Sequence, residues 1–366
     1  MDFAALNKGK YVPALLGIIA MLIGIFVLGL ILLHLKSVLV PLAVALLLSI
    51  IFQPIVLFLR NRRVPTILVL AVVALTLLLV LAAPGYMVYA SAASLTRTFD
   101  SYMPRIEALM YDVEELAAQI AGQVGLDLAD LDLSQIIDIS SVTSIASGAL
   151  GEVASLVANA LLVVLFMMFL LASVNQLDTK VKAAYEPDTA SRILGIIRRI
   201  SLQVRRYLIA KALVSAGTGV LVFLVLWLLR VDFPVFWGFL AFILNFIPTV
   251  GDLVATLLPT LLALLQFDTL VVPILCFVLL WLVQVVMGNV LQPRLMAFSL
   301  NLSPVVVLMS LIFWAWFWGI PGMILAVPLT ATIKIIFENI EGLRPLAVLM
   351  GSAPAQQGVA VIPADE

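Results

Sequence analysis

Five uninterrupted apolar stretches constrain this chain more than any other feature of its sequence. They cover residues 13–33, 37–59, 64–90, 151–174 and 207–229. A helix needs about 20 apolar residues to cross the hydrocarbon core of a bilayer. Moreover, 64% of all residues are apolar and only 11% are charged, which is too few charges to cover the surface of a soluble protein. The sequence therefore predicts an all-α polytopic membrane protein whose main partner is the lipid bilayer.

The distribution of positive charge predicts the orientation of these spans. Lys8 and Lys10 precede the first span, three arginines follow the second, and the link between the fourth and fifth spans is strongly basic. The link 91–150, by contrast, holds two arginines and nine acidic residues. Because cytoplasmic loops are enriched in lysine and arginine, we expect both termini in the cytoplasm, the link 91–150 outside, and the protein in the inner (plasma) membrane.

Both long links show helical patterns. In the link 91–150, apolar residues recur at helical spacing, which indicates either a helix lying on a surface or a contact between subunits. They are Ile106, Leu109, Val113, Leu116 and Ile120. In the link 180–206, isoleucines and arginines fall mainly on opposite faces. This second pattern is typical of a helix in the inner headgroup layer, and a solvated basic loop is the alternative.

Two later apolar stretches, 234–265 and 303–340, are interrupted in their middle. A helix of 38 residues, the length of the second stretch, is about 57 Å long, nearly twice the thickness of the bilayer core. Proline removes a helix donor and glycine loosens the backbone, so both are expected to break these stretches. The breaking residues are Pro248 and Gly251 in the first stretch, and Gly319, Pro321 and Gly322 in the second.

Paired broken segments in an apolar sequence indicate the binding site of a transporter. We expect each to form a re-entrant hairpin, because broken backbone at membrane depth must be sheltered by protein or by a wet cavity. The alternative is that 234–265 is one kinked span, which would place Arg294 on the opposite side of the membrane. A sixth full span is expected at 270–288.

The expected fold is thus six full transmembrane helices, two segments broken by proline and glycine, and an extracytoplasmic helical insertion. Its organisation is a three-helix membrane part (1–90), the insertion (91–150), two membrane helices with a basic amphipathic link (151–230), a broken-helix transport region (231–345) and a disordered tail (346–366).

The sequence resembles the autoinducer-2 exporter (AI-2E) family of bacterial membrane proteins, also called PerM-like. The resemblance covers about residues 10–345 and rests on the order of several motifs. They are Gln203–Tyr207 with Lys211, Phe246–Gly251, Asn289–Arg294, Leu302–Pro304 and Trp318–Leu329. It implies a transporter, either an exporter of an autoinducer-2-like solute or an exchanger of sodium or lithium for protons, and a homo-oligomer. Asp252 departs from the family pattern, in which a small or apolar residue usually follows that glycine.

Asp252 is the first candidate for a solute-binding or ion-binding residue, because an ionisable group within a membrane segment is by default a functional hypothesis. Its structural alternative is the N-cap of the next half-helix. The full set of candidates is Asp252, Asn245, Pro248, Gly251, Asn289, Gln292, Arg294, Gly319, Pro321 and Gly322. The amides would hydrogen-bond a polyhydroxyl solute, and Arg294 would either pair with Asp252 or snorkel to the inner surface.

Other polar and aromatic residues receive structural interpretations. Gln284 is expected to hydrogen-bond between helices, and Lys211 and Lys334 to snorkel at span ends. His34 is placed at the interface. The dense aromatic set between 313 and 318 is interpreted as an interfacial belt, with a lining of the solute path as the alternative. Its members are Phe313, Trp314, Trp316, Phe317 and Trp318.

No motif for an enzyme, a nucleotide or a metal occurs in the sequence. One histidine and one cysteine do not make a typical zinc site, and the phosphate-loop, His-Glu-x-x-His and Gly-x-Ser-x-Gly patterns are missing. We expect no enzymatic activity, no cofactor and no nucleic-acid partner. Three hypotheses remain: a secondary transporter or exporter of a small polar solute, an exchanger of monovalent cations for protons that uses Asp252, and a membrane scaffold that does not transport.

Overall fold

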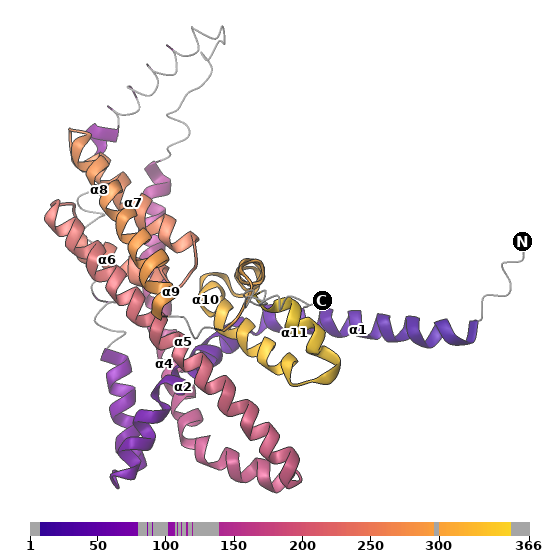
Figure 1. Cartoon of the computed structure of the whole chain (residues 1–366). Coiled ribbons are helices and arrows are strands. Elements are labelled where there is room, and N and C mark those ends of the chain that lie inside the picture. Colours follow the sequence, from indigo (N-terminus) through magenta and orange to yellow (C-terminus); the bar gives the residue numbers. More distant parts are fainter. Residues whose placement is uncertain are drawn as a thin grey trace, which may run out of the picture. The chain divides into compact units, whose positions relative to one another are not determined.

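The computed structural model describes residues 8–79, 139–295 and 300–352, together with 86, 90, 102–106, 108, 111, 115 and 119. The regular structure of these residues is entirely helical, as expected. The contacts divide the chain into a smaller unit, Met1–Leu46 with Asn301–Glu366, and a larger unit, Leu47–Leu300. Each unit is described by itself (Figure 1).

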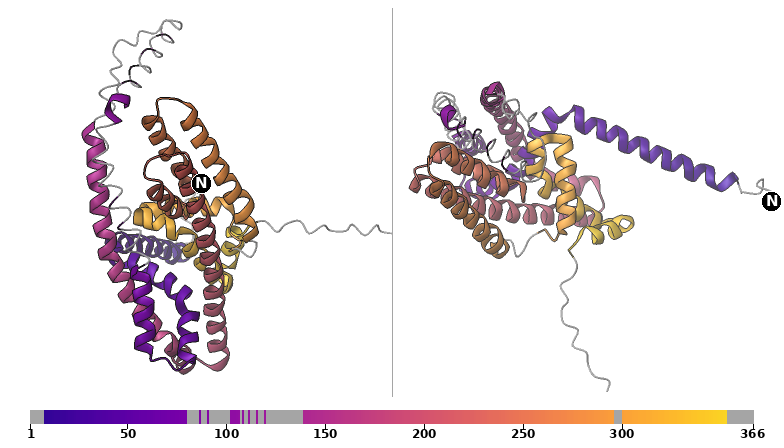
Figure 2. Two further views of the ribbon diagram at one scale, coloured as in Figure 1. Left: turned by 90° about the vertical axis from the view of Figure 1, so that its left-hand side faces the viewer. Right: turned by 90° about the horizontal axis from the view of Figure 1, so that it is seen from above.

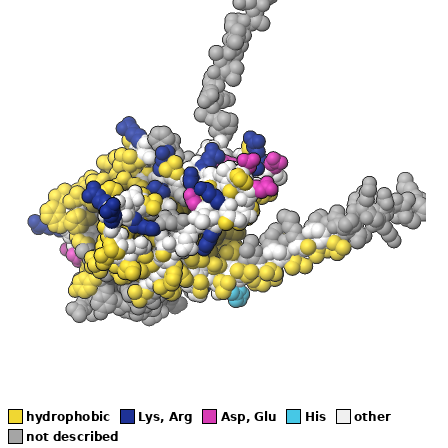
Figure 3. Space-filling model, turned by 90° about the horizontal axis from the view of Figure 1, so that it is seen from below, with side chains coloured by type: hydrophobic (Ala, Val, Ile, Leu, Met, Phe, Trp, Pro, Cys, Tyr) yellow, Lys and Arg dark blue, Asp and Glu magenta, His cyan; other side chains and the backbone are white. Residues whose placement is uncertain are grey.

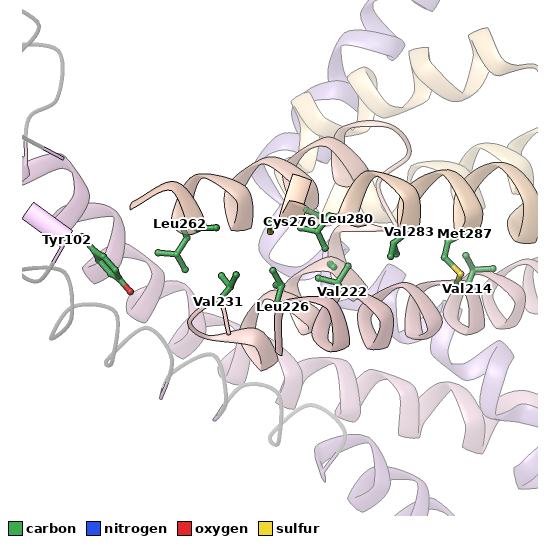
Figure 4. Packing of buried hydrophobic residues seen from close by; sticks show 13 residues of the cluster. Tyr102, Val214, Val222, Leu226, Val231, Leu262, Cys276, Leu280, Val283 and Met287 are labelled. Atoms are coloured by element: carbon green, nitrogen blue, oxygen red, sulfur yellow. The ribbon is translucent and has the colours of Figure 1, made fainter. Parts of the chain in front are cut away.

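Most helices belong to the larger unit. They are the greater part of α2 (Lys36–Asn61), a helix over Thr66–Leu79, α4 (Ile139–Ala184), α5 (Pro187–Leu228), α6 (Pro234–Leu244), α7 (Val250–Gln266), α8 (Val271–Gln284), a π-helix (Val285–Leu291) and α9 (Gln292–Leu295). α6 packs along α5, and α7 packs on both α6 and α8. The side chains buried between α5, α6, α7 and α8 form one apolar cluster (Figure 4).

The smaller unit contains α1 (Lys8–His34), α10 (Pro304–Glu338), a short 3-10 helix (Glu341–Leu343) and α11 (Arg344–Met350). α10 is not straight, because Gly319 adopts φ 67° and ψ −143° in its middle. The indole Nε1 of Trp314 donates to Oγ1 of Thr330 at 3.3 Å. Sixteen residues of continuous helix would separate these residues by about 24 Å. The second broken stretch therefore folds back on itself, as a hairpin does.

Exposed apolar side chains support a membrane environment. Trp227, Val271 and Ile274 are 63%, 71% and 60% exposed. Hydrophobic side chains reach the surface over wide areas of the face in Figure 3, beside groups of Lys and Arg. Among the described residues, four helices are long and apolar enough to cross a membrane by length and composition, and a fifth is added if Asn159–Ser173 and Gln176–Ala184, bent by 59°, form one span. One of the four is α10, which is the broken stretch described above and not one of the six full spans expected. The number of six full spans stays a prediction.

The basic link between the fourth and fifth spans is helical, but it is not a separate helix. α4 continues to Ala184 and α5 begins at Pro187, so the two helices extend into a hairpin with a short turn (Figure 2, left). Nη2 of Arg198 pairs with Oδ2 of Asp178 at 3.1 Å across this hairpin. The sequence pattern showed the two faces of this helix, but it did not reveal that the helix is continuous with α5.

Two further expectations fall at the edges of the described residues. Of the apolar pattern in the link 91–150, only Ile106 is described, and it packs against the apolar cluster of the larger unit. The other four positions lie outside the described residues. The predicted start of the disordered tail, residue 346, lies too early in the chain, because α11 extends to Met350.

Candidate functional site

The first broken segment is a hairpin with its tip at residues 245–249. α6 ends at Leu244, α7 begins at Val250, and Thr249 between them has a left-handed φ of 62°. Pro248 is half-buried in this turn. A Cβ on Gly251 would lie 1.8 Å from the carbonyl oxygen of Leu244, so only glycine fits where the two arms meet.

Gln266 closes the base of this hairpin. Its Nε2 donates to the carbonyl of Arg230 at 2.9 Å, and its Oε1 accepts from the backbone N–H of Asp232 at 2.8 Å. The residues just before α6 and the last residue of α7 are therefore neighbours. A single kinked crossing would separate the same residues by about 30 Å. The chain thus reverses at 245–249, which is the hairpin geometry and not the kinked alternative.

Lys211 is a buried cation on α5. It is only 3% exposed, and its Nζ donates to Oε1 of Gln292 at 2.9 Å. Burying a charge among apolar groups is costly unless it is hydrogen-bonded. The prediction that Lys211 snorkels to the membrane surface is wrong, because its ammonium group is held inside the protein by Gln292.

Asn245 forms a second buried polar contact one helical turn further along α5. Its Nδ2 donates to Oγ of Ser215 at 2.9 Å, and the two residues are 5% and 0% exposed. Ser215 follows Lys211 by four residues, so both polar side chains lie on one face of α5. This bond connects the end of α6 to the same face of α5 that carries Lys211.

Asp252 lies in the first turn of α7 and is half-buried. Its charge interacts electrostatically with that of Lys211. It is not the N-cap, because that position is taken by Thr249; a carboxylate in the first turn is nevertheless favoured by the helix dipole. Among the described residues, Asp252 makes no ion pair with Arg294, which is exposed, and the charge that interacts with it electrostatically is that of Lys211. The alternative, that Arg294 snorkels to the inner surface, stays a prediction.

A π-helix precedes Gln292 and covers Val285–Leu291. Such short π segments are rare and often occur at functional sites. Met287 packs onto α5, where a Cβ on Gly217 would lie 2.7 Å from its Cε. Asn289 is exposed, so it does not join the buried group. Nε2 of Gln284 is buried with no hydrogen-bond partner among the described residues, which does not fit the expected bond between helices.

The second break belongs to the smaller unit. Gly319 and Pro321 are exposed, whereas Gly322 is buried and a Cβ on it would lie 2.0 Å from the carbonyl oxygen of Trp314. As in the first hairpin, a glycine permits the close approach of two arms. These three candidates therefore shape a turn in the smaller unit, and the buried polar group described above belongs to the larger one.

Three of the five aromatic residues near this break are buried, which contradicts a simple interfacial belt. Trp314, Phe317 and Trp318 are 7%, 7% and 8% exposed, and Nε1 of Trp318 donates to the carbonyl of Leu32 at 3.1 Å. Phe313 and Trp316 remain exposed, at 48% and 70%. The indoles therefore hold the second hairpin together and attach it to α1.

Lys334 was expected to snorkel and His34 to lie at an interface. Lys334 is 4% exposed and its Nζ pairs with Oε1 of Glu338 at 3.1 Å, so the first expectation is wrong. His34 is exposed and its Nδ1 bonds to the carbonyl of Leu30 at 2.9 Å.

The larger unit thus brings together five polar side chains within apolar helices. They are Lys211, Ser215, Asn245, Asp252 and Gln292. An ammonium group offers three donors, a carboxylate only acceptors, and an amide both. The group therefore combines hydrogen-bond donors and acceptors within one unit of the fold. Ser215 is not among the site residues predicted from the sequence, although a hydroxyl one helical turn after a lysine in an apolar run is a signal for it.

Comparison with known proteins agrees with the resemblance stated above. Residues 16–342 match the family described as AI-2E family transporter. The AI-2 transport protein TqsA of Escherichia coli is 33% identical over 318 residues, 86% of this chain and 89% of TqsA. The putative transport protein YhhT of the same organism is 30% identical over 86% of this chain and 88% of its own. A putative transport protein of Borreliella burgdorferi is 28% identical over 87% of this chain and 86% of its own.

Proposed function

This chain belongs to the AI-2E family of transporters, and we propose that it carries a small polar solute across the membrane through the group around Lys211. One observation carries the proposal: a buried lysine is hydrogen-bonded to Gln292 inside apolar helices, beside the tip of a broken hairpin. Ionisable residues inside a membrane are costly and mark transport pathways. A role in folding alone would not require a charge there.

The solute class follows from the donors and acceptors of the site. Lys211 offers donors, Asp252 offers acceptors, and the amides of Asn245 and Gln292 offer both. TqsA is named as an AI-2 transport protein, and its similarity supports a solute of that kind. We therefore propose that the solute is a neutral polyhydroxyl compound. We further propose that the protein has the orientation predicted by the positive-inside rule, with both termini in the cytoplasm, and that it exports the solute. Homo-oligomeric assembly stays a prediction.

The competing hypotheses receive less support. The three relatives described above are named as transport proteins, none as an exchanger of cations for protons. In addition, the charge of Asp252 interacts electrostatically with that of Lys211. A membrane scaffold that does not transport would leave the membership of a transporter family unexplained.

A flux assay with the purified full chain in liposomes tests the proposal, with synthetic autoinducer-2 as the solute. We expect wild-type flux, and a loss of at least about tenfold for Lys211→Met, because a hydrogen bond to a charged group is worth about 1.5–3 kcal/mol. Lys182→Met, which removes an exposed lysine at the end of α4, is the matched control and should leave flux unchanged. Equal flux through both variants would contradict the proposed site.

A further inference from the structure

A polar cavity of about 470 Å³ lies at the base of the α6–α7 hairpin. It is some 14 residues of helix, or about 21 Å, away from Asp252. We call it the insertion pocket, because half of its lining comes from the link 91–150. Its lining residues are Tyr102, Pro104, Arg105, Ala108, Asp232, Leu265, Gln266 and Asp268.

Hydrogen bonds fix the polar walls of the insertion pocket. The hydroxyl of Tyr102, which is 5% exposed, donates to Oδ2 of Asp232 at 2.5 Å. Nη2 of Arg105 donates to the carbonyl of Asp268 at 3.2 Å. Gln266 holds the backbone of Asp232 from the other side. Burial and the neighbouring Asp232 raise the pKa of Tyr102, so its hydroxyl remains a donor at physiological pH.

One strong donor in this pocket, Nε of Arg105, is buried and makes no hydrogen bond among the described residues. A buried donor without an acceptor is costly, and such groups in native structures call for an explanation. On the acceptor side, Oδ2 of Asp232 accepts from Tyr102, and a carboxylate accommodates several donors. Within the described part of the chain, the pocket thus presents one donor without a partner and a carboxylate that can accept further hydrogen bonds.

The charges of the pocket select a chemical class of ligand. The carboxylates of Asp232 and Asp268 disfavour an anion, and the guanidinium of Arg105 disfavours a cation. A hydroxyl group both donates and accepts, so it satisfies the Nε–H of Arg105 and a carboxylate oxygen at once. Pro104, Ala108 and Leu265 supply apolar walls for the carbon atoms of such a ligand. The cavity volume lies within the range of about 300–1,000 Å³ that is typical of small-molecule sites.

We propose that the insertion pocket is a binding site for a small, neutral polyhydroxyl solute, separate from the group around Lys211. Such a ligand would contact Gln266 and Asp232, the residues that close the hairpin base. In the orientation that the positive-inside rule predicts, the pocket faces the outside. The proposal does not depend on transport, because it concerns binding only.

Binding of erythritol, a neutral four-carbon polyol, tests this proposal. The full chain in lipid nanodiscs is titrated with erythritol, and binding is followed by saturation-transfer NMR. Arg105→Lys keeps the charge but loses the Nε–H, and Ala108→Phe fills the cavity without removing a polar group. Arg198→Lys makes the same exchange at the exposed ion pair of the α4–α5 hairpin and is the matched control. Thermal unfolding monitors the fold of each variant.

We expect wild-type binding in the millimolar range, a Kd at least about tenfold higher for Arg105→Lys, no binding to Ala108→Phe, and no change for Arg198→Lys. No wild-type binding, unchanged binding to a folded Ala108→Phe, or binding of L-alanine in place of erythritol would overturn the proposal. Lys211→Met separates the two sites. If it abolishes flux and keeps erythritol binding, both proposals stand, and wild-type flux without erythritol binding would remove only this one.

Discussion

Gly219 in α5 and Gly238 in α6 face each other so closely that neither position has room for a side chain. A Cβ on Gly219 would lie 2.6 Å from the carbonyl oxygen of Gly238, and a Cβ on Gly238 would lie 2.7 Å from the carbonyl oxygen of Gly219. Close approach of backbones through small residues is the usual way in which membrane helices associate. This crossing places the first arm of the hairpin against the helix that carries Lys211.

The crossing predicts that alanine substitutions at two glycines of α5 change the stability of the protein in opposite directions. Gly219→Ala forces the backbones apart and should lower the free energy of unfolding by about 1–3 kcal/mol. Gly195→Ala is the control, because a Cβ there meets no atom within 4 Å, and its better helix propensity should raise stability by up to about 1 kcal/mol. Thermal unfolding in detergent measures both. Equal effects of the two substitutions would contradict the close contact.

Removal of the buried hydroxyl of Ser215 should destabilise the protein. Ser215→Ala leaves the buried amide of Asn245 without its acceptor, at a cost of about 1–3 kcal/mol. The double variant Ser215→Ala with Asn245→Leu removes both partners and should recover part of this loss. Ser191→Ala, at an exposed position of the same helix, is the control and should change stability little. A denaturant series on the four proteins provides the comparison.

Asp252 and Arg294 should differ in their effect on flux, although both are charged candidates. Asp252→Asn removes the charge that interacts with Lys211, whereas Arg294 is exposed. We expect autoinducer-2 flux in liposomes to fall at least several-fold for Asp252→Asn and to remain near wild type for Arg294→Gln. If Arg294→Gln has the larger effect, the residues assigned to the site are the wrong ones.

The hairpin predicts which positions share one side of the membrane. Cys276 is the single cysteine and is buried, so Cys276→Ala provides a background without thiols. Val235→Cys and Asp268→Cys, at the two ends of the hairpin, should react with an impermeant maleimide from the same side. Thr249→Cys, at the tip, should not react from that side. Labelling of the two ends from opposite sides would restore the single kinked crossing.

Tyr102 should keep its proton when other tyrosines ionise. Its pKa is raised above the ordinary 10.0 by burial and by Asp232, so the bond to Asp232 contributes stability below about pH 10 that is lost as the pH rises further. The tyrosinate absorbance at about pH 11 should be nearly the same in wild type and Tyr102→Phe. A smaller absorbance in the variant would show that Tyr102 ionises normally.

Sequence patterns predicted the helical class, the family and both reversals of the chain, because proline and glycine act on the backbone wherever they occur. The sequence did not reveal what the polar side chains would contact. Lys211 and Gln292 are 81 residues apart along the chain, and only the packing of α9 beside α5 brings them together. The sequence also did not reveal the burial of Trp314, Phe317 and Trp318. Aromatic residues of this kind are typical of a membrane interface, but the fold of α10 buries these three.

Gln266 makes two hydrogen bonds, one to the carbonyl of Arg230 and one to the backbone N–H of Asp232, and these tie the last residue of α7 to the residues just before α6. At the opposite end of the hairpin, Asn245 is hydrogen-bonded to Ser215 of α5. The α6–α7 pair is therefore fastened at both of its ends, so the loss of either attachment is expected to loosen the whole pair.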